Sequence, residues 1–123
     1  MNKPPVPPLD SAKARQIRTA IYARYSSDNQ SETSIDDQVY QCRVRADQEG
    51  WEVIDAYTDS AMSGASAFRP SYQRLIEDAR FGRFDVVLAE GLDRLSRDQE
   101  DIAFLYKHLN FAGVRLVTLL REM

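Results

Sequence analysis

Apolar and polar positions along the chain repeat with two different periods, and the two periods alternate. Runs of β-branched and aromatic residues predict four strands, at 19–25, 51–58, 84–89 and 114–120. Apolar stripes spaced three and four residues apart predict three helices between them. The helices are expected to begin at Thr33 or Ser34, at Pro70 and at Asp98, and to end at Gly50, Gly82 and Gly113.

This order of elements, βαβαβαβ with a short return loop after each helix, predicts how they assemble. Short connections of this kind place the strands parallel to one another and the helices across the sheet. We therefore expect an α/β fold with a mostly parallel four- to five-stranded sheet and helices on both faces. Cys42, the only cysteine, lies on the apolar stripe of the first helix and is expected to fill the core.

Two segments interrupt the pattern. Four prolines within residues 4–8 cannot sustain a helix or a sheet, so residues 1–18 are expected to form a disordered arm. Residues 59–69 are small and polar and include a glycine, which predicts a mobile loop after the second strand. The remaining residues, 19–123, are enough for one domain with one core.

Charge and composition narrow the function classes. The 16 basic and 19 acidic side chains give a net charge of −3, which excludes a uniformly basic surface for nucleic acid. Among the basic residues 13 are arginines, whose planar fork binds phosphate through two hydrogen bonds. A single cysteine provides no disulfide framework. Since the sequence has neither an apolar run of membrane-spanning length nor a secretory signal, we expect a cytoplasmic protein.

Candidate chemistry gathers where three of the predicted strands end. Ligands of open parallel sheets bind outside the carboxyl ends of the strands, which here selects residues 22–27, 59–69 and 90–97. Arginines beside a serine favour phosphoryl transfer, because fixed guanidinium groups stabilise a five-coordinate phosphorus. His108, the only histidine, lies far from this edge, which argues against a Ser-His-Asp triad. The side chains expected at the edge are Ser26, Arg24, Arg69, Arg94 and Arg97.

An ordered set of motifs covers the same edge. In order and spacing, the set resembles the N-terminal catalytic domain of the serine recombinases, the resolvases and invertases, from residue 19 to the end of the chain. Residues 34–38, Ser-Ile-x-x-Gln, are more similar to the large serine recombinases. The resemblance implies a resolvase-like fold of flavodoxin-like topology. The motifs are Tyr22-x-Arg24-x-Ser26, Gln30, Gln38, Ser63-Gly64 with Arg69, and Leu92-Asp93-Arg94-Leu95-x-Arg97-Asp98.

The resemblance also implies a role for each of these residues. Ser26 is the implied nucleophile, which attacks a DNA phosphodiester to give a 5′-phosphoseryl intermediate and a free 3′-hydroxyl. Strand exchange and religation then follow without ATP. The arginines grip the phosphate, Asp93 orients an arginine or passes a proton, and no metal or other cofactor is implied. The implied catalytic residues are Ser26, Arg24, Arg69, Asp93, Arg94 and Arg97, and the implied supporting residues are Tyr22, Gln30 and Gln38.

Partners follow from the resemblance as well. The family acts on DNA as dimers that meet as tetramers, so DNA and further copies of the chain are the implied partners. In the family the catalytic domain continues into a dimerisation helix and a DNA-binding domain, whereas this sequence stops at Met123, just after the fourth predicted strand. We therefore expect the chain alone to be weakly active or inactive.

Other hypotheses stay open at this level. A flavodoxin-like module, or a remnant that only pairs with a partner, shares the fold without the chemistry. A metal-dependent nuclease would use Asp59, Glu90 and Asp93. In the simplest interpretations, Ser26 is a turn or cap serine, and residues 93–97 form ion pairs on an exposed helix.

Overall fold

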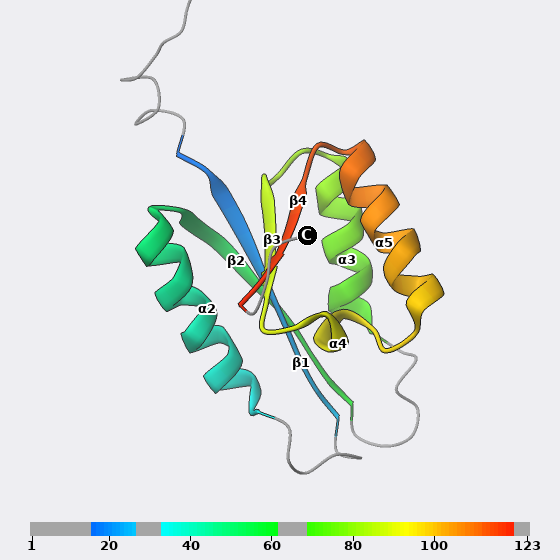
Figure 1. Ribbon diagram of the computed structural model, residues 1–123, viewed down its shortest axis with the longest axis horizontal. Coiled ribbons are helices and arrows are strands. Elements are labelled where there is room, and N and C mark those ends of the chain that lie inside the picture. Colours follow the sequence, from blue (N-terminus) through cyan, green and yellow to red (C-terminus); the bar gives the residue numbers. More distant parts are fainter. Residues whose placement is uncertain (1–15, 27–32, 62–68, 120–123) are drawn as a thin grey trace, which may run out of the picture.

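A central sheet of parallel strands lies between two helical layers (Figure 1). The computed structural model describes residues 16–26, 33–61 and 69–119. The strands are β1 (Arg18–Ser26), β2 (Glu52–Ala61), β3 (Val86–Ala89) and β4 (Arg115–Thr118). The helices are α2 (Ile35–Glu49), α3 (Pro70–Arg80), α4 (Leu92–Leu95) and α5 (Gln99–Phe111).

The topology confirms the predicted fold class. The strands pair in parallel, in the spatial order β2-β1-β3-β4. Helix α2 covers one face of the sheet, and α3 and α5 lie side by side on the other face (Figure 1). The chain is therefore an α/β protein with a parallel sheet and helices on both faces, as the alternating pattern predicts.

Local capping bonds set the helix boundaries. Ser34 Oγ accepts a hydrogen bond from the Asp37 N–H at 3.1 Å, and Asp98 Oδ1 accepts one from the Glu100 N–H at 3.0 Å. These bonds satisfy amides that the first helical turn leaves unpaired, so α2 and α5 begin where the sequence predicts. Gly50 ends α2 with a φ of 77°, a left-handed conformation that favours glycine.

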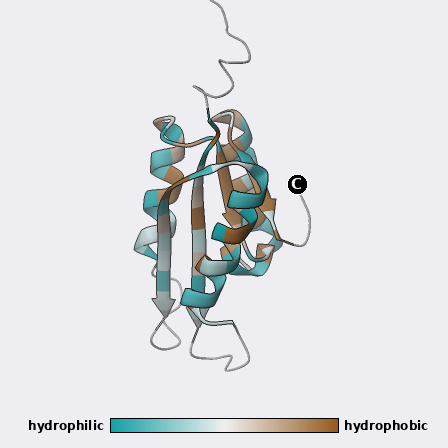
Figure 2. Cartoon of the chain, turned by 90° about the vertical axis from the view of Figure 1, so that its left-hand side faces the viewer, coloured by the Kyte–Doolittle hydropathy of each residue, from teal (hydrophilic) through white to brown (hydrophobic). Residues whose placement is uncertain are grey.

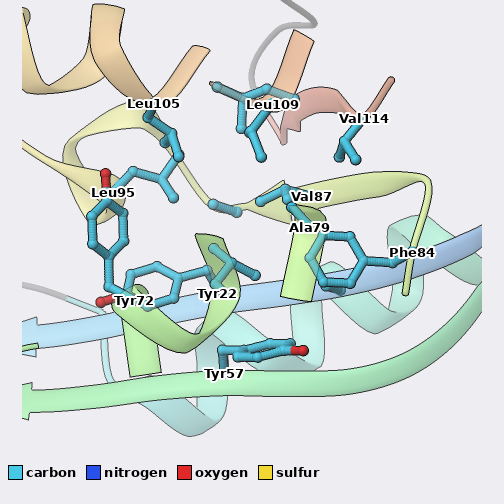
Figure 3. Packing of buried hydrophobic residues seen from close by; sticks show 14 residues of the cluster. Tyr22, Tyr57, Tyr72, Ala79, Phe84, Val87, Leu95, Leu105, Leu109 and Val114 are labelled. Atoms are coloured by element: carbon cyan, nitrogen blue, oxygen red, sulfur yellow. The ribbon is translucent and has the colours of Figure 1, made fainter. Parts of the chain in front are cut away.

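Two apolar clusters attach the helices to the sheet, one on each face. Alternate residues of β1 contribute to both, since Tyr22 packs toward α3 and α5 whereas Ile21 packs toward α2. Cys42 is fully buried in the α2 cluster, which confirms its predicted place in the core. Figure 2 shows the hydrophobic residues on the strands and the inner sides of the helices. The cluster beneath α3 and α5 contains the rings of Tyr22, Tyr57, Tyr72 and Phe84 (Figure 3).

The ends of the strands differ from the prediction. β2 continues to Ala61 because its main chain pairs with β1 as far as Ser26, opposite Ala61. Residues 59–61 are therefore strand rather than loop, since ladder hydrogen bonds do not require apolar side chains. β3 and β4 are shorter than predicted. Phe84, which lies before β3, is buried by an edge-on contact with Tyr57 rather than by strand pairing.

Helix α4 is missing from the sequence prediction. It has four residues, about one turn, which is too short to display a helical period of apolar positions. It follows β3 after only two residues and carries Asp93 and Arg94. No helix in the described ranges is long and apolar enough to cross a lipid bilayer.

Candidate active site

Three of the predicted arginines meet at the carboxyl end of the sheet. Arg24 comes from β1, Arg69 directly precedes α3, and Arg94 lies on α4. The main-chain carbonyl of Arg94 accepts a hydrogen bond from Arg24 Nε at 3.1 Å and another from Arg69 Nη2 at 3.4 Å. One backbone oxygen therefore links guanidinium groups from separate parts of the chain.

Arg24 is buried, with 7% of its surface exposed. Its Nη2 donates to the carbonyl of Asp93 at 3.0 Å, so this side chain also holds the turn of α4. Gln38 fixes the main chain of Arg24 from the other face of the sheet. Gln38 Oε1 accepts from the Arg24 N–H at 3.2 Å, and Gln38 Nε2 donates to the carbonyls of Arg24 at 2.9 Å and Thr33 at 2.7 Å. Gln38 thus supports the site through the backbone of Arg24.

Arg94 is paired with carboxylates. Its Nε donates to Glu90 Oε1 at 3.1 Å, and its Nη2 lies 3.6 Å from Asp93 Oδ2. The Arg94 side chain is 10% exposed and that of Glu90 21%, so their ion pair is largely shielded from water. Residue 94 therefore does not sit on an exposed helix face, in contrast to the simplest interpretation of the sequence. Glu90 is a site residue that the family resemblance did not single out.

Asp59 organises the start of α3. Its Oδ1 accepts from the Ser71 N–H at 3.0 Å, and its Oδ2 accepts from the Tyr72 N–H at 2.9 Å and from the Tyr22 hydroxyl at 2.7 Å. The sequence prediction places Asp59 in a loop and misses this role. The signal was the alternation of Tyr57 and Asp59 along β2, both of which are buried. Burial is the main cause that raises the pKa of the Tyr22 hydroxyl above its ordinary value, although Arg69 opposes it.

Arg69 is half-buried and lies among aromatic groups. Its Nε and Nη2 donate to the Tyr22 hydroxyl at 3.3 and 3.1 Å. Its guanidinium carbon is 3.8 Å from the centroid of the Tyr72 ring and 5.4 Å from that of Tyr22. The two rings meet edge to face, with centroids 5.6 Å apart. Tyr22, an expected supporting residue, thus touches both Asp59 and Arg69.

The other predicted residues are placed as follows. Ser26 is the last residue of β1, where its main chain pairs with Ala61, and its side chain is outside the described part of the structure. Arg97 is exposed in the segment between α4 and α5. His108 lies on α5 with its ring 4.3 Å from that of Phe104, away from the site. Gln30, Ser63, Gly64 and residues 1–15 of the arm expected over residues 1–18 lie outside the described residues. The expected end of the arm is wrong, because Arg18 begins β1 and its guanidinium donates to the Asp85 carboxylate.

The carboxylates of Asp59 and Glu90 at this edge of the sheet already accept hydrogen bonds from neighbouring groups. Both oxygens of Asp59 accept from N–H or O–H groups, and Glu90 pairs with Arg94. Among residues 16–26, 33–61 and 69–119, no group of three or more His, Cys, Asp or Glu side chains is placed to hold a metal ion. The arrangement instead presents cations at a strand end, which is suited to an anionic substrate.

Comparison with known proteins decides the family. The sequence model described as "Resolvase, N terminal domain" matches residues 19–122, nearly the whole chain after the proline-rich segment. The chain belongs to this family. Similar solved structures support the same family. One of them, the N-terminal catalytic domain of TP901-1 integrase, has 38% sequence identity to this chain and a TM-score of 0.74. That similarity covers 84% of this chain and 77% of the other.

Two further relatives extend the comparison. The C-terminal catalytic domain of ISC1926 TnpA, an IS607-like serine recombinase, has 29% identity and a TM-score of 0.73, covering 84% of this chain and 70% of that one. A Bacillus subtilis (strain 168) protein provisionally named a DNA recombinase is 39% identical over 80 residues. That match covers 63% of this chain and 15% of the relative, so this recombinase-family domain spans a small part of the relative's length.

Proposed function

We propose that the chain is the catalytic domain of a site-specific DNA recombinase in which Ser26 is the nucleophile. The observation that carries the proposal is the convergence of the Arg24 and Arg69 guanidinium groups on the main-chain carbonyl of Arg94. Ser26 ends the same strand as Arg24, two residues later, and positions two apart in a strand lie on the same face. A nucleophile and phosphate-binding cations therefore belong to one edge of the sheet.

The proposed reaction exchanges one phosphoester for another. The Ser26 hydroxyl oxygen bonds to the DNA phosphorus, and the bond from phosphorus to the 3′ oxygen breaks. The serine proton ends on the departing oxygen, which leaves a 3′-hydroxyl and a 5′-phosphoseryl link. Attack by the 3′-hydroxyl of an exchanged strand reverses these steps and releases Ser26. Since an ester replaces an ester, religation requires no ATP.

The arginines supply the electrostatic part of catalysis. Negative charge builds on the phosphoryl oxygens at the five-coordinate stage, and cations fixed beforehand stabilise that charge most effectively. Arg24 and Arg94 are buried and hydrogen-bonded, so their reorganisation during the reaction is small. Arg97 is exposed beside α4 and is proposed to reach the DNA phosphate. Asp93 is proposed to orient Arg94, whose Nη2 is near its carboxylate.

The supporting and partner roles complete the proposal. Gln38 and Tyr22 hold Arg24 and Arg69, and Gln30 is proposed to support the reacting groups. DNA is the substrate, and copies of the chain are proposed to associate as dimers and then as tetramers for strand exchange. The metal-dependent nuclease is disfavoured because Asp59 and Glu90 already serve as hydrogen-bond acceptors for neighbouring groups.

A covalent-trapping experiment tests the proposal. The chain is assayed alone and as a chimera in which it replaces the catalytic domain of TP901-1 integrase, with that enzyme's DNA sites as substrate. Each substrate carries a nick near the exchange point, so that a cleaved fragment diffuses away and the protein–DNA link accumulates. The reaction is run in EDTA and resolved on a denaturing gel, and the attached residue is identified by mass spectrometry.

We expect a covalent band that carries DNA on Ser26, at least from the chimera. Ser26→Ala abolishes this band, and Ser27→Ala, the matched control, retains it. A band that persists in Ser26→Ala assigns the nucleophile elsewhere. No band from wild-type chain in either format, or a band that EDTA removes, overturns the proposed reaction in favour of the non-catalytic module or the nuclease.

A further inference from the structure

Within the described residues, the partners of Arg69 are all electrically neutral. They are the Tyr22 hydroxyl, the Arg94 carbonyl and the faces of two tyrosine rings. No carboxylate in the described part of the chain lies within ion-pair distance of Arg69, and its Nη1 makes no hydrogen bond to that part. Arg94 differs because Glu90 and Asp93 surround its guanidinium. Among the described residues, half-buried Arg69 therefore has no ion-pair partner.

Tyr72 is the nearest of these partners. It is 7% exposed, its N–H is bound to Asp59, and its ring packs edge to face against Tyr22, as Figure 3 shows. Its hydroxyl is buried and has no hydrogen-bond partner in the part of the chain that the structure describes. Burial raises the pKa of this hydroxyl to about 12, so the ring stays neutral at physiological pH. The ring is thus a fixed, uncharged surface directly beneath the Arg69 guanidinium.

A ring face and a carboxylate hold a cation with different consequences. A carboxylate neutralises the guanidinium and competes with phosphate for its N–H groups. A ring face attracts the cation through its quadrupole and leaves the N–H groups in the guanidinium plane available. Asp59 is close by, but three donors already occupy its oxygens. Asp59 thus forms no ion pair with Arg69.

We propose that Tyr72 is a positioning residue whose ring face orients the Arg69 guanidinium for a phosphate group of the substrate. This inference rests on the proposed function, because it assigns the anion at Arg69 to the DNA phosphate. It concerns the ring and not the hydroxyl. Tyr72 then does more than fill the core beneath α3: it fixes the direction in which a catalytic cation presents its N–H groups.

The test observes Arg69 directly in the intact chain. Isotope-labelled protein is titrated with inorganic phosphate at constant ionic strength, and the arginine Nε–H resonances are followed by NMR, with Arg69→Lys identifying the Arg69 signal. Arg80, exposed on α3, is the internal control for non-specific ionic effects. The variants are Tyr72→Phe, which retains the ring, and Tyr72→Leu, which removes it. Phenylalanines with increasing ring fluorination at position 72 weaken the quadrupole while retaining the shape.

We expect saturable binding at Arg69 in wild type and in Tyr72→Phe. In Tyr72→Leu the affinity falls about threefold to tenfold and the Arg69 signal loses its ring-current shift. Fluorination lowers the phosphate affinity stepwise. This series tests the role of the ring face even if Tyr72→Leu fails to fold. Equal affinities across the series, an equal loss in Tyr72→Phe, or an equal response of Arg80 overturns the proposal. The titration requires no cleavage of DNA, so failure of the cleavage assay and failure of this inference are distinguishable.

Discussion

Each arginine of the site is held by a different kind of partner. Arg24 donates to backbone carbonyls, Arg94 to a carboxylate, and Arg69 to a hydroxyl and a carbonyl while stacking on rings. These environments assign different tasks to chemically identical side chains. Buried Arg24 stabilises the turn that carries Arg94, whereas Arg69 forms no ion pair among the described residues.

A substitution of Arg97 should separate an effect on catalysis from an effect on folding stability. It is exposed, so Arg97→Ala should change the free energy of unfolding by no more than about 0.5 kcal/mol. If it binds phosphate in the transition state, the covalent-trapping rate should fall about 100- to 1,000-fold. Arg80→Ala, at an exposed position on α3, is the control and should retain the wild-type rate. A wild-type rate in Arg97→Ala would remove this residue from the site.

The sequence predicted the positions of the site arginines better than it predicted which residues bind them. Arg24 and Arg94 lie within spaced motifs at predicted strand ends, so a rule about parallel sheets was enough to bring them together. Asp59 and Glu90 are single carboxylates in polar segments, and such residues are most often solvated. The role of Asp59 depends on the tertiary contact between β2 and α3, which no local spacing encodes. Glu90 differs, because it pairs with Arg94 at the local i,i+4 spacing, and the sequence does not show that this pair is shielded from water.

At the level of elements, the site is built from strand ends and helix starts. β1 supplies Arg24, and the first turn of α3 is fixed on β2 through Asp59. The long helices were predictable because apolar stripes and caps agree. The extension of β2 was not predictable, because the pairing of its polar end depends on β1. Helix α4 was not predictable either, because it is too short to show a helical period of apolar residues.

Gln38 connects α2 to the end of β1, so its removal should affect both. Gln38→Leu leaves buried main-chain groups of Arg24 short of partners and should cost about 1–3 kcal/mol in unfolding free energy. Gln41→Leu, exposed on the same helix, should change it little. Urea unfolding monitored by circular dichroism measures both. Equal stability of the two variants would mean that water or relaxation replaces the Gln38 bonds.

Asp59 should be as important for α3 as a residue within the helix. Asp59→Ala removes the acceptor of two first-turn amides and of the Tyr22 hydroxyl, and an unfolding cost of about 1–2 kcal/mol is expected. Asp55→Ala, exposed on the same strand, is the matched control. Hydrogen exchange of the Ser71 and Tyr72 amides should accelerate only in the Asp59 variant. Unchanged protection of those amides would show that another group caps α3.

For the molecule as a whole, the sheet separates two cores, and the buried tyrosines lie in one of them. Tyr22, Tyr57 and Tyr72 all lie in the cluster beneath α3 and α5. Burial is the leading cause that raises the pKa of each hydroxyl, to about 12 for Tyr72. The unfolded chain loses these phenol protons near pH 10, whereas the folded chain keeps them to higher pH.

This difference predicts alkaline instability with a defined sign. Below about pH 10 both states bind the tyrosine protons and stability is at its full value. Above it the unfolded state binds fewer protons, so the free energy of unfolding should fall continuously toward pH 12. Urea midpoints measured from pH 8 to pH 11.5 check the trend. Tyr72→Phe should flatten the decline, and an identical slope in that variant would exclude Tyr72 as a contributor.

The Arg94 carbonyl sets a limit on what side-chain replacement can reveal. Every natural amino acid at position 94 retains that oxygen, so the acceptor shared by Arg24 and Arg69 survives any codon change there. Replacing the amide between Arg94 and Leu95 by an ester weakens this acceptor while all side chains stay in place. Semisynthesis of such a depsipeptide would loosen two guanidinium groups at once, an effect that mutagenesis can reach only by deleting them.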